Sequence, residues 1–180
     1  MLRLAIVAAL ASTAIPAIAA EPGEPPLTGH TKETGLPLTA DQQSVRFTHA
    51  DLSWTVNPSA ETIAGDAVLT LKVEKPITAI QFDLDRNLPV SAIMIGEDRL
   101  PASEWSNPDG RLSIDLPRSY SPSELLTVRI LYGGTPHVAI KAPWEGGFVW
   151  SKTPAGAPWI ATAVQGEGCD LFWPCFDNSL

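Results

Sequence analysis

A series of short apolar runs dominates the sequence between Ser44 and Gly134. The runs are rich in Val, Ile, Leu and Thr, and Pro, Gly, Asn or Asp interrupts them about every eight to twelve residues, a spacing typical of all-β domains. Apolar and polar residues alternate within SVRFTHADLSWTV and AGDAVLTLKVEK, and this period of two predicts strands with one buried face. The remaining runs are ITAIQFDLD, VSAIMIGEDRLP, GRLSIDLP and ELLTVRILYGG. The pattern predicts an all-β, antiparallel, sandwich-like domain.

Long helices are not expected anywhere in the chain. No stretch shows a helical period over about twelve residues, and the 17 prolines of the sequence disfavour helix further because each removes a backbone donor. No repeat of fixed period is visible, which argues against solenoids and propellers. The chain has 180 residues, enough for one β-domain with its own core and too few for two substantial domains.

The N-terminal residues have the features of an export signal. Residues 1–20 contain one Arg at position 3, a short apolar run and a small-residue exit, which predicts a signal peptide cleaved after Ala19 or Ala20. An anchor or a buried strand is the alternative interpretation. The apolar run is shorter than the roughly 20 residues that span a bilayer, so we expect a periplasmic or extracellular protein without a membrane span. Residues 21–43 are rich in Pro, Gly and Thr, so we expect them to form a flexible lead. We expect residues 44–180 to form the β-domain.

The charge of the chain argues against a nucleic-acid partner. Lys and Arg number 12 against 20 Asp and Glu, which gives a formal net charge of −8. The sequence contains no cluster of basic residues, and an acidic surface repels phosphate.

Motifs for catalysis are absent from the sequence. The histidines, His30, His49 and His137, are far apart and do not form H-E-x-x-H, so we expect them to be structural. No G-x-S-x-G elbow occurs. Asp83 and Asp85 lie two residues apart on one strand face and could in principle act on a glycoside, but such pairs are more often solvated charges.

The two cysteines leave two interpretations open. Cys169 and Cys175 are six residues apart and would enter an oxidising compartment, so they form either a disulfide or two free thiols. Their spacing, without a neighbouring histidine, is not a zinc signature.

The C-terminal part differs from the rest in composition. Glycines flank Glu167 in the segment Gln165-Gly166-Glu167-Gly168, and they allow the backbone to approach a ligand closely. A carboxylate held there could bind an ammonium group, whereas the simpler interpretation is a polar turn after a strand that ends near Val164. Four of the 6 tryptophans also lie beyond residue 140, which suggests a covered or partner-facing surface: Trp144, Trp150, Trp159 and Trp173.

These segments together resemble the N-terminal domain of the aminopeptidase N family of zinc metallopeptidases. The resemblance runs from about Phe47 to Asn178, and its most specific part is the terminal motif TAVQGEGCDLFWPCFDN. The matching strand segments are AGDAVLTLKV, ITAIQFDLD, VSAIMIGEDRLP and LTVRILYGG. In that family a saddle-shaped β-domain precedes a thermolysin-like catalytic domain, so the resemblance implies a saddle-like shape for this domain too.

The resemblance also implies roles for individual residues. Gln165 and Glu167 match the residues that line the family's substrate pocket, where the glutamate helps to bind the free α-amino group of the peptide. Pro174, Cys175 and Asp177 match a following segment of structural character. The family's zinc motif, glutamate ligand, Gly-x-Met-Glu-Asn loop and catalytic tyrosine lie beyond the residues matched here.

We therefore expect a substrate-side domain that lacks the zinc-binding catalytic domain and has no activity alone. In this interpretation the chain contains no catalytic residue and no metal ligand, and zinc belongs to the missing domain. Two other interpretations remain: a stand-alone exported β-module that binds a glycan or protein through its Trp-rich end, and the product of a truncated reading frame.

Overall fold

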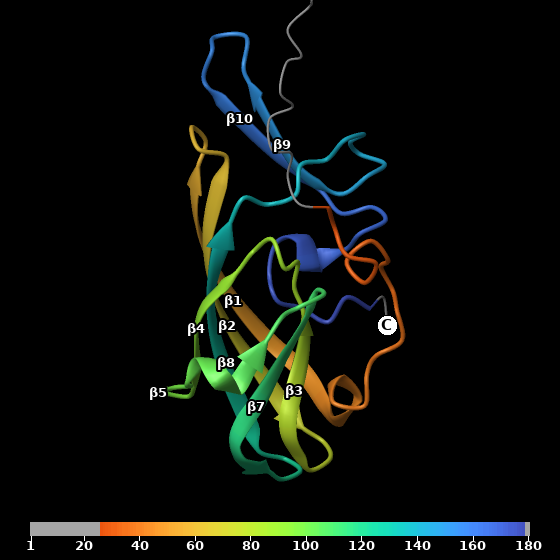
Figure 1. Cartoon of the computed structure of the whole chain (residues 1–180), viewed down its shortest axis with the longest axis vertical. Helices are drawn as coiled ribbons and strands as arrows, with labels where there is room; N and C mark the ends of the chain where they lie inside the picture. Colours follow the sequence, from red (N-terminus) through yellow and green to blue (C-terminus); the bar gives the residue numbers. More distant parts are fainter. Residues whose placement is uncertain (1–25, 179–180) are drawn as a thin grey trace, which may run out of the picture.

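The computed structural model describes residues 26–178 of the chain, so the predicted signal peptide lies outside the described residues. All the strand pairs are antiparallel, and they form sheets of five, three and two strands (Figure 1). The described helical segments are short 3₁₀ turns, η1 (Gln42–Ser44), η2 (Ala102–Glu104) and η3 (Cys169–Leu171). The all-β prediction is confirmed. No helix of the described part is long and apolar enough to cross a membrane.

The five-stranded sheet has the order β1-β2-β8-β4-β5. In β2, apolar residues at alternate positions are fully buried, as the sequence pattern predicts. The strands are β1 (Val45–Asn57), β2 (Thr62–Val73), β4 (Val90–Ile95), β5 (Asp98–Arg99) and β8 (Leu125–Gly134).

One part of the β1 prediction is wrong. The alternation placed His49 on the same face as Val45 and Phe47, but the pairing with β2 shifts between Phe47 and His49. This bulge adds one residue to β1, and the inward-facing positions move to Ala50 and Leu52. His49 is therefore exposed.

The three-stranded sheet packs against the larger one. Its order is β3-β7-β6, with β3 (Ile77–Asp83), β6 (Trp105–Ser106) and β7 (Arg111–Tyr120). Side chains from both sheets form one apolar cluster, so the two sheets share a core as in a sandwich. Its fully buried members include Leu69, Leu71, Ile80, Phe82, Leu112, Ile114, Leu126 and Ile130.

Two further segments border this sandwich. The hairpin of β9 (Gly147–Lys152) and β10 (Pro158–Ala163) forms the two-stranded sheet and projects from one end of the molecule (Figure 1). The described part of the lead, residues 26–43, runs along the side where the C-terminal segment lies (Figure 1). Leu27, Thr31 and Gln42 of this lead are buried, which the composition of the segment did not predict.

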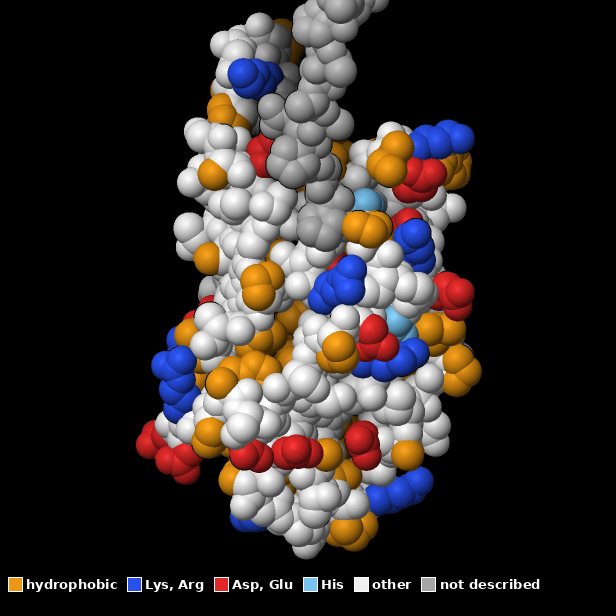
Figure 2. Space-filling model, in the orientation of Figure 1, with side chains coloured by type: hydrophobic (Ala, Val, Ile, Leu, Met, Phe, Trp, Pro, Cys, Tyr) orange, Lys and Arg blue, Asp and Glu red, His pale blue; other side chains and the backbone are white. Residues whose placement is uncertain are grey.

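Acidic and basic side chains are interspersed on the face shown in Figure 2, without an extended basic surface. This distribution agrees with the charge balance of the sequence.

Candidate functional site

The segment from Gln165 to Glu167 forms a turn directly after β10. Strand β10 ends at Ala163, and the Gly168 N–H donates to the Val164 carbonyl oxygen at 3.0 Å, which closes the turn. Gln165 is exposed and Glu167 is partly exposed. The expected turn is therefore present, and it presents both predicted substrate-binding side chains at the surface.

The Glu167 carboxylate has a backbone partner from another segment. The Gly146 N–H, one residue before β9, donates to Glu167 Oε2 at 2.6 Å. The pairing of Gly147 with Ala163 brings the start of β9 beside the end of β10 and so beside the turn. Among the described residues, this is the one hydrogen bond at the carboxylate, so Oε1 has no hydrogen-bond partner among them.

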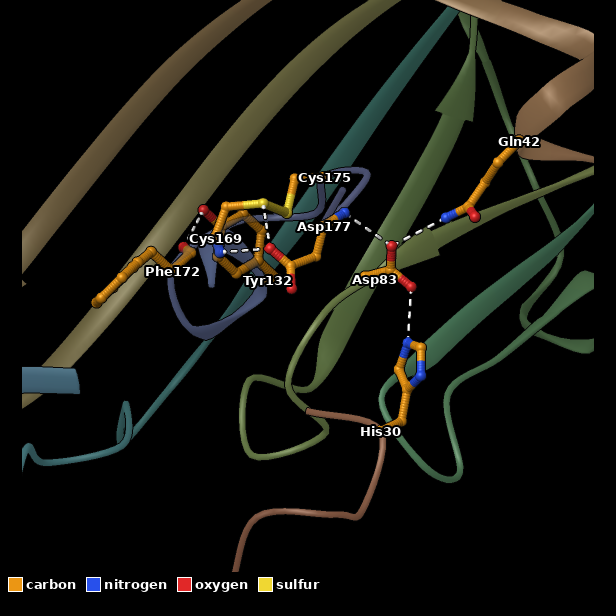
Figure 3. Close-up of a disulfide and its surroundings, with 8 residues drawn as sticks. All are labelled: His30, Gln42, Asp83, Tyr132, Cys169, Phe172, Cys175 and Asp177. Carbon is orange, nitrogen blue, oxygen red and sulfur yellow. Dashed lines mark hydrogen bonds and ion pairs between the residues drawn. A yellow bond between two sulfur atoms is a disulfide. The ribbon is translucent and has the colours of Figure 1, made fainter. Parts of the chain in front are cut away.

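A disulfide holds the segment that follows the turn. Cys169 and Cys175 are bonded to each other, which decides between the two interpretations left open by the sequence. Asp177 Oδ1 accepts a hydrogen bond from the Cys169 N–H at 3.2 Å (Figure 3). Cys175 pairs with Asp83 at the end of β3 through two backbone hydrogen bonds of 2.8 and 3.0 Å. The C-terminal segment is thus attached to the edge strand β3 of the three-stranded sheet.

Asp83 connects three parts of the chain (Figure 3). Its Oδ1 pairs with His30 Nε2 at 2.7 Å, and its Oδ2 accepts from Gln42 Nε2 at 2.9 Å and from the Asp177 N–H at 3.0 Å. The carboxylate therefore joins the lead and the C-terminal segment to β3.

The prediction of solvated charges at Asp83 and Asp85 is wrong, because both residues are buried. The lead and the C-terminal segment cover the end of β3, and the period of two could not reveal that cover. The hydrogen-bond donors around the Asp83 carboxylate compensate for the water that it loses on burial.

Asp170 is the most perturbed acid of this region. Its pKa is raised to about 8, mainly by burial and further by the negative charges of Asp177, Asp83 and Asp85. The carboxyl group therefore keeps its proton at neutral pH. Its Oδ1 has no hydrogen-bond partner among the described residues.

Tyr132 links the larger sheet to the same segment, and sequence reasoning did not single it out. Its hydroxyl accepts from Trp54 Nε1 at 2.7 Å and donates to the Phe172 carbonyl oxygen at 2.8 Å. Burial raises the pKa of Tyr132 to about 12. The hydroxyl therefore stays protonated and serves as a structural donor.

In the described part of the chain, one group of at least three side chains of the kinds that bind metals lies close together. It consists of Cys169, Cys175 and Asp177, whose ligand atoms lie within 4.8 Å of one another. The two sulfur atoms are joined in the disulfide, so they are not free to bind a metal.

The tryptophans of the C-terminal part divide into two pairs. Trp150 stacks on Phe148 with 5.2 Å between ring centroids, and Trp173 packs edge-on against Phe47 at 6.0 Å. Trp144 and Trp159 are 64% and 60% exposed. Trp144 and Trp159 are thus exposed, whereas Trp150 and Trp173 pack against other aromatic rings.

The fold is of the class found in zinc metallopeptidases. The structure is similar to that of an M1 zinc metallopeptidase from Deinococcus radiodurans, with 24% sequence identity and a TM-score of 0.55. For a mutant of that protein bound to the substrate Tyr-Ser-Ala, the sequence identity is 24% and the TM-score 0.56. For a two-domain M1 zinc metallopeptidase mutant bound to L-arginine, the identity is 25% and the TM-score 0.54.

The similarity covers 82% of this chain but 32% of each of those chains, so the chain spans about a third of the length of these solved structures. The chain matches no protein-family model and no curated protein. The neighbours agree with the resemblance seen in the sequence and place the chain with one part of such metallopeptidases by fold.

Proposed function

We propose that this chain is the N-terminal, substrate-side domain of an aminopeptidase N-like zinc metallopeptidase. The observation that carries this proposal is the structural similarity, which extends over 82% of the chain but over 32% of the metallopeptidases compared. The terminal motif supports it, since Gln165 and Glu167 lie together on an exposed turn after β10.

In this function Glu167 binds the α-ammonium group of a peptide. A carboxylate and an ammonium group form charge-assisted hydrogen bonds, which are about twice as strong as neutral ones. Oε2 of Glu167 is engaged by Gly146, so the ammonium group would bind at Oε1. Gln165 supplies an amide that can donate to and accept from the peptide backbone.

Hydrolysis would require a separate catalytic domain that holds zinc. Zinc at such a site activates a water molecule for attack on the peptide bond. We therefore expect the chain alone to bind peptide amines weakly and not to hydrolyse them.

Two measurements on the purified protein test whether catalysis requires a separate zinc-binding domain. The first is zinc content, and the second is hydrolysis of an alanine anilide with and without added zinc. Stoichiometric zinc together with sustained turnover would contradict the proposal, because it would place a complete active site in this chain.

The location of the protein is part of the same proposal. Export would bring Cys169 and Cys175 into an oxidising compartment, where a disulfide such as the one observed persists. Cell fractionation and N-terminal sequencing check this expectation. A mature protein that begins at Ala20 or Glu21 is the expected result, and a full-length cytoplasmic product would contradict it.

A second candidate function is favoured by the exposed rings of Trp144 and Trp159. A cavity of about 520 Å³ lies between the β9–β10 hairpin and the β1–β2 turn, lined by Trp150, Ile160, Pro58 and Glu61 among others. Exposed aromatic rings suit the apolar faces of sugars and protein partners. Tryptophan fluorescence titration with a set of oligosaccharides and with cell-envelope extracts tests this function, and an unchanged emission with all of them would contradict it.

A further inference from the structure

Gly146 contacts the candidate amine-binding carboxylate through its backbone. Its N–H donates to Glu167 Oε2 at 2.6 Å, across a sequence separation of 21 residues. A hydrogen bond to a charged group contributes more than one between neutral groups. The contact therefore fixes one oxygen of Glu167 from a segment that is distant in the sequence.

A side chain at position 146 would crowd the Glu167 carboxylate. A Cβ atom there would lie 2.8 Å from Glu167 Oε2, 3.1 Å from Leu171 Cδ1 and 3.3 Å from the Ala163 carbonyl oxygen. The shortest of these contacts is with the movable end of the Glu167 side chain. An alanine at 146 would therefore be accommodated mainly by a displacement of the carboxylate, at little cost to the fold.

The backbone of the turn itself is held independently of Gly146. The Thr34 N–H of the lead donates to the Gly166 carbonyl oxygen at 3.2 Å, and the Gly168 N–H donates to the Val164 carbonyl oxygen at 3.0 Å. The disulfide begins at Cys169, directly after the turn. The course of the backbone is thus set from both sides, while the direction of the Glu167 side chain depends on the Gly146 contact.

We propose that Gly146 is a positioning residue for the peptide-binding site, because its N–H holds Oε2 of Glu167 and leaves Oε1 for the ammonium group. The lead contributes to the same site by supporting the turn through Thr34. This inference rests on the proposed function, since it assigns a role to Gly146 in amine binding by Glu167. A pre-organised carboxylate binds more tightly because less side-chain freedom is lost on binding.

The test uses NMR spectroscopy of the whole isotope-labelled chain, with alanyl-alanine amide as the probe. This probe has an α-ammonium group and no carboxylate, and its N-acetylated form serves as the negative control. We expect Gly146→Ala to weaken probe binding about tenfold, the loss expected for about one hydrogen bond to a charged group. Glu167→Ala should abolish binding and shift the amide proton resonance of Gly146 upfield.

Gly29→Ala is the matched control. Gly29 is exposed, has no atom within 4 Å of its hypothetical Cβ, and lies in the lead far along the sequence from Gly146. This variant should bind like the wild type, and melting curves should show that Gly146→Ala remains folded. A merely structural role for Gly146 would change the melting temperature without moving the Glu167 side-chain resonances.

The possible failures are distinguishable. If the Gly146 amide resonance does not shift in Glu167→Ala, the positioning contact is overturned. It is also overturned if Gly146→Ala binds the probe with the affinity of the wild type. Failure of the wild-type protein to bind the probe, with the Gly146 resonance still responding to Glu167→Ala, overturns the amine-binding function and with it the role assigned to Gly146.

Discussion

At the scale of single residues, the C-terminal segment depends on Asp170, whose carboxyl group is protonated, and on Gly168, whose backbone conformation favours glycine. Asp170 is buried among Asp83, Asp85 and Asp177, and its pKa is raised to about 8. Gly168 has a φ of 98° and is buried against Asp177. Both residues flank the disulfide-bonded Cys169, so they control the segment that follows Glu167.

Asp170→Asn tests the neutral acid. In the folded protein the group holds its proton up to about pH 8, whereas the unfolded carboxyl group loses it near its ordinary pKa of 3.8. The folded state therefore binds more protons between these values, and stability from this group is present below about pH 4 and lost as the pH rises towards 8. The slope is at most about 1.4 kcal/mol per pH unit.

Asparagine stays neutral, so Asp170→Asn should gain stability relative to the wild type as the pH rises from 4 to 8. Urea unfolding of both proteins at pH 4, 6 and 8 measures the difference. The other titratable groups are the same in both proteins, so the difference reports on position 170. An equal difference at all three pH values would contradict the raised pKa.

Gly168→Ala tests the backbone conformation after the turn. An L-residue is strained at the φ of 98°, and the added Cβ would overlap the Asp177 carboxylate. We expect a loss of about 2–4 kcal/mol in the free energy of unfolding. Guanidinium denaturation measures it, and Gly29→Ala, within about 0.5 kcal/mol of the wild type, is the control for a general Gly-to-Ala effect. A loss as small as that of the control would show that the turn tolerates side chains.

At the scale of elements, the lead and the C-terminal segment are attached to β3 through Asp83. His30 and Gln42 hold the lead to this carboxylate, and the Asp177 N–H holds the C-terminal segment. The disulfide adds a covalent link within the second of these segments. The turn with Gln165 and Glu167 therefore has supports on both sides.

Replacing both cysteines by serine should destabilise the segment. In the chain-entropy treatment, a crosslink that closes so short a loop contributes about 2 kcal/mol. We expect the double variant to lose about this amount and to show faster amide hydrogen exchange at residues 165–177 than in the sandwich. Equal protection in the variant and the wild type would contradict a role for the disulfide in holding the turn.

At the scale of the whole molecule, the five- and three-stranded sheets share one core, whereas the β9–β10 hairpin projects from it (Figure 1). A shared core predicts that both sheets unfold in a single transition. Strand β10 of this hairpin carries Trp159, which is exposed.

Leu69→Ala tests the shared core. Leu69 of β2 is fully buried, and truncation of such a side chain costs about 2–5 kcal/mol. Hydrogen exchange should report the same loss for amides in β2 and in β7, because the two sheets unfold together. Destabilisation confined to the five-stranded sheet would show that the sheets unfold separately.

The sequence alone determined the all-β class and much of the strand pattern. The period of two in β2 was sufficient because half of its residues face a core, and the turn at 165–167 followed from its glycines. The resemblance in the terminal motif pointed to the same fold as the structural similarity did.

Only the tertiary structure decided what lies beside Glu167 and what covers β3. Gly146 and the lead approach the turn from distant parts of the chain, and the bulge in β1 changes the facing of residues after Phe47. Periodicity describes one strand at a time, so it cannot reveal contacts made by packing between segments. The buried Asp83, the neutral Asp170 and the bond between Cys169 and Cys175 are consequences of that packing.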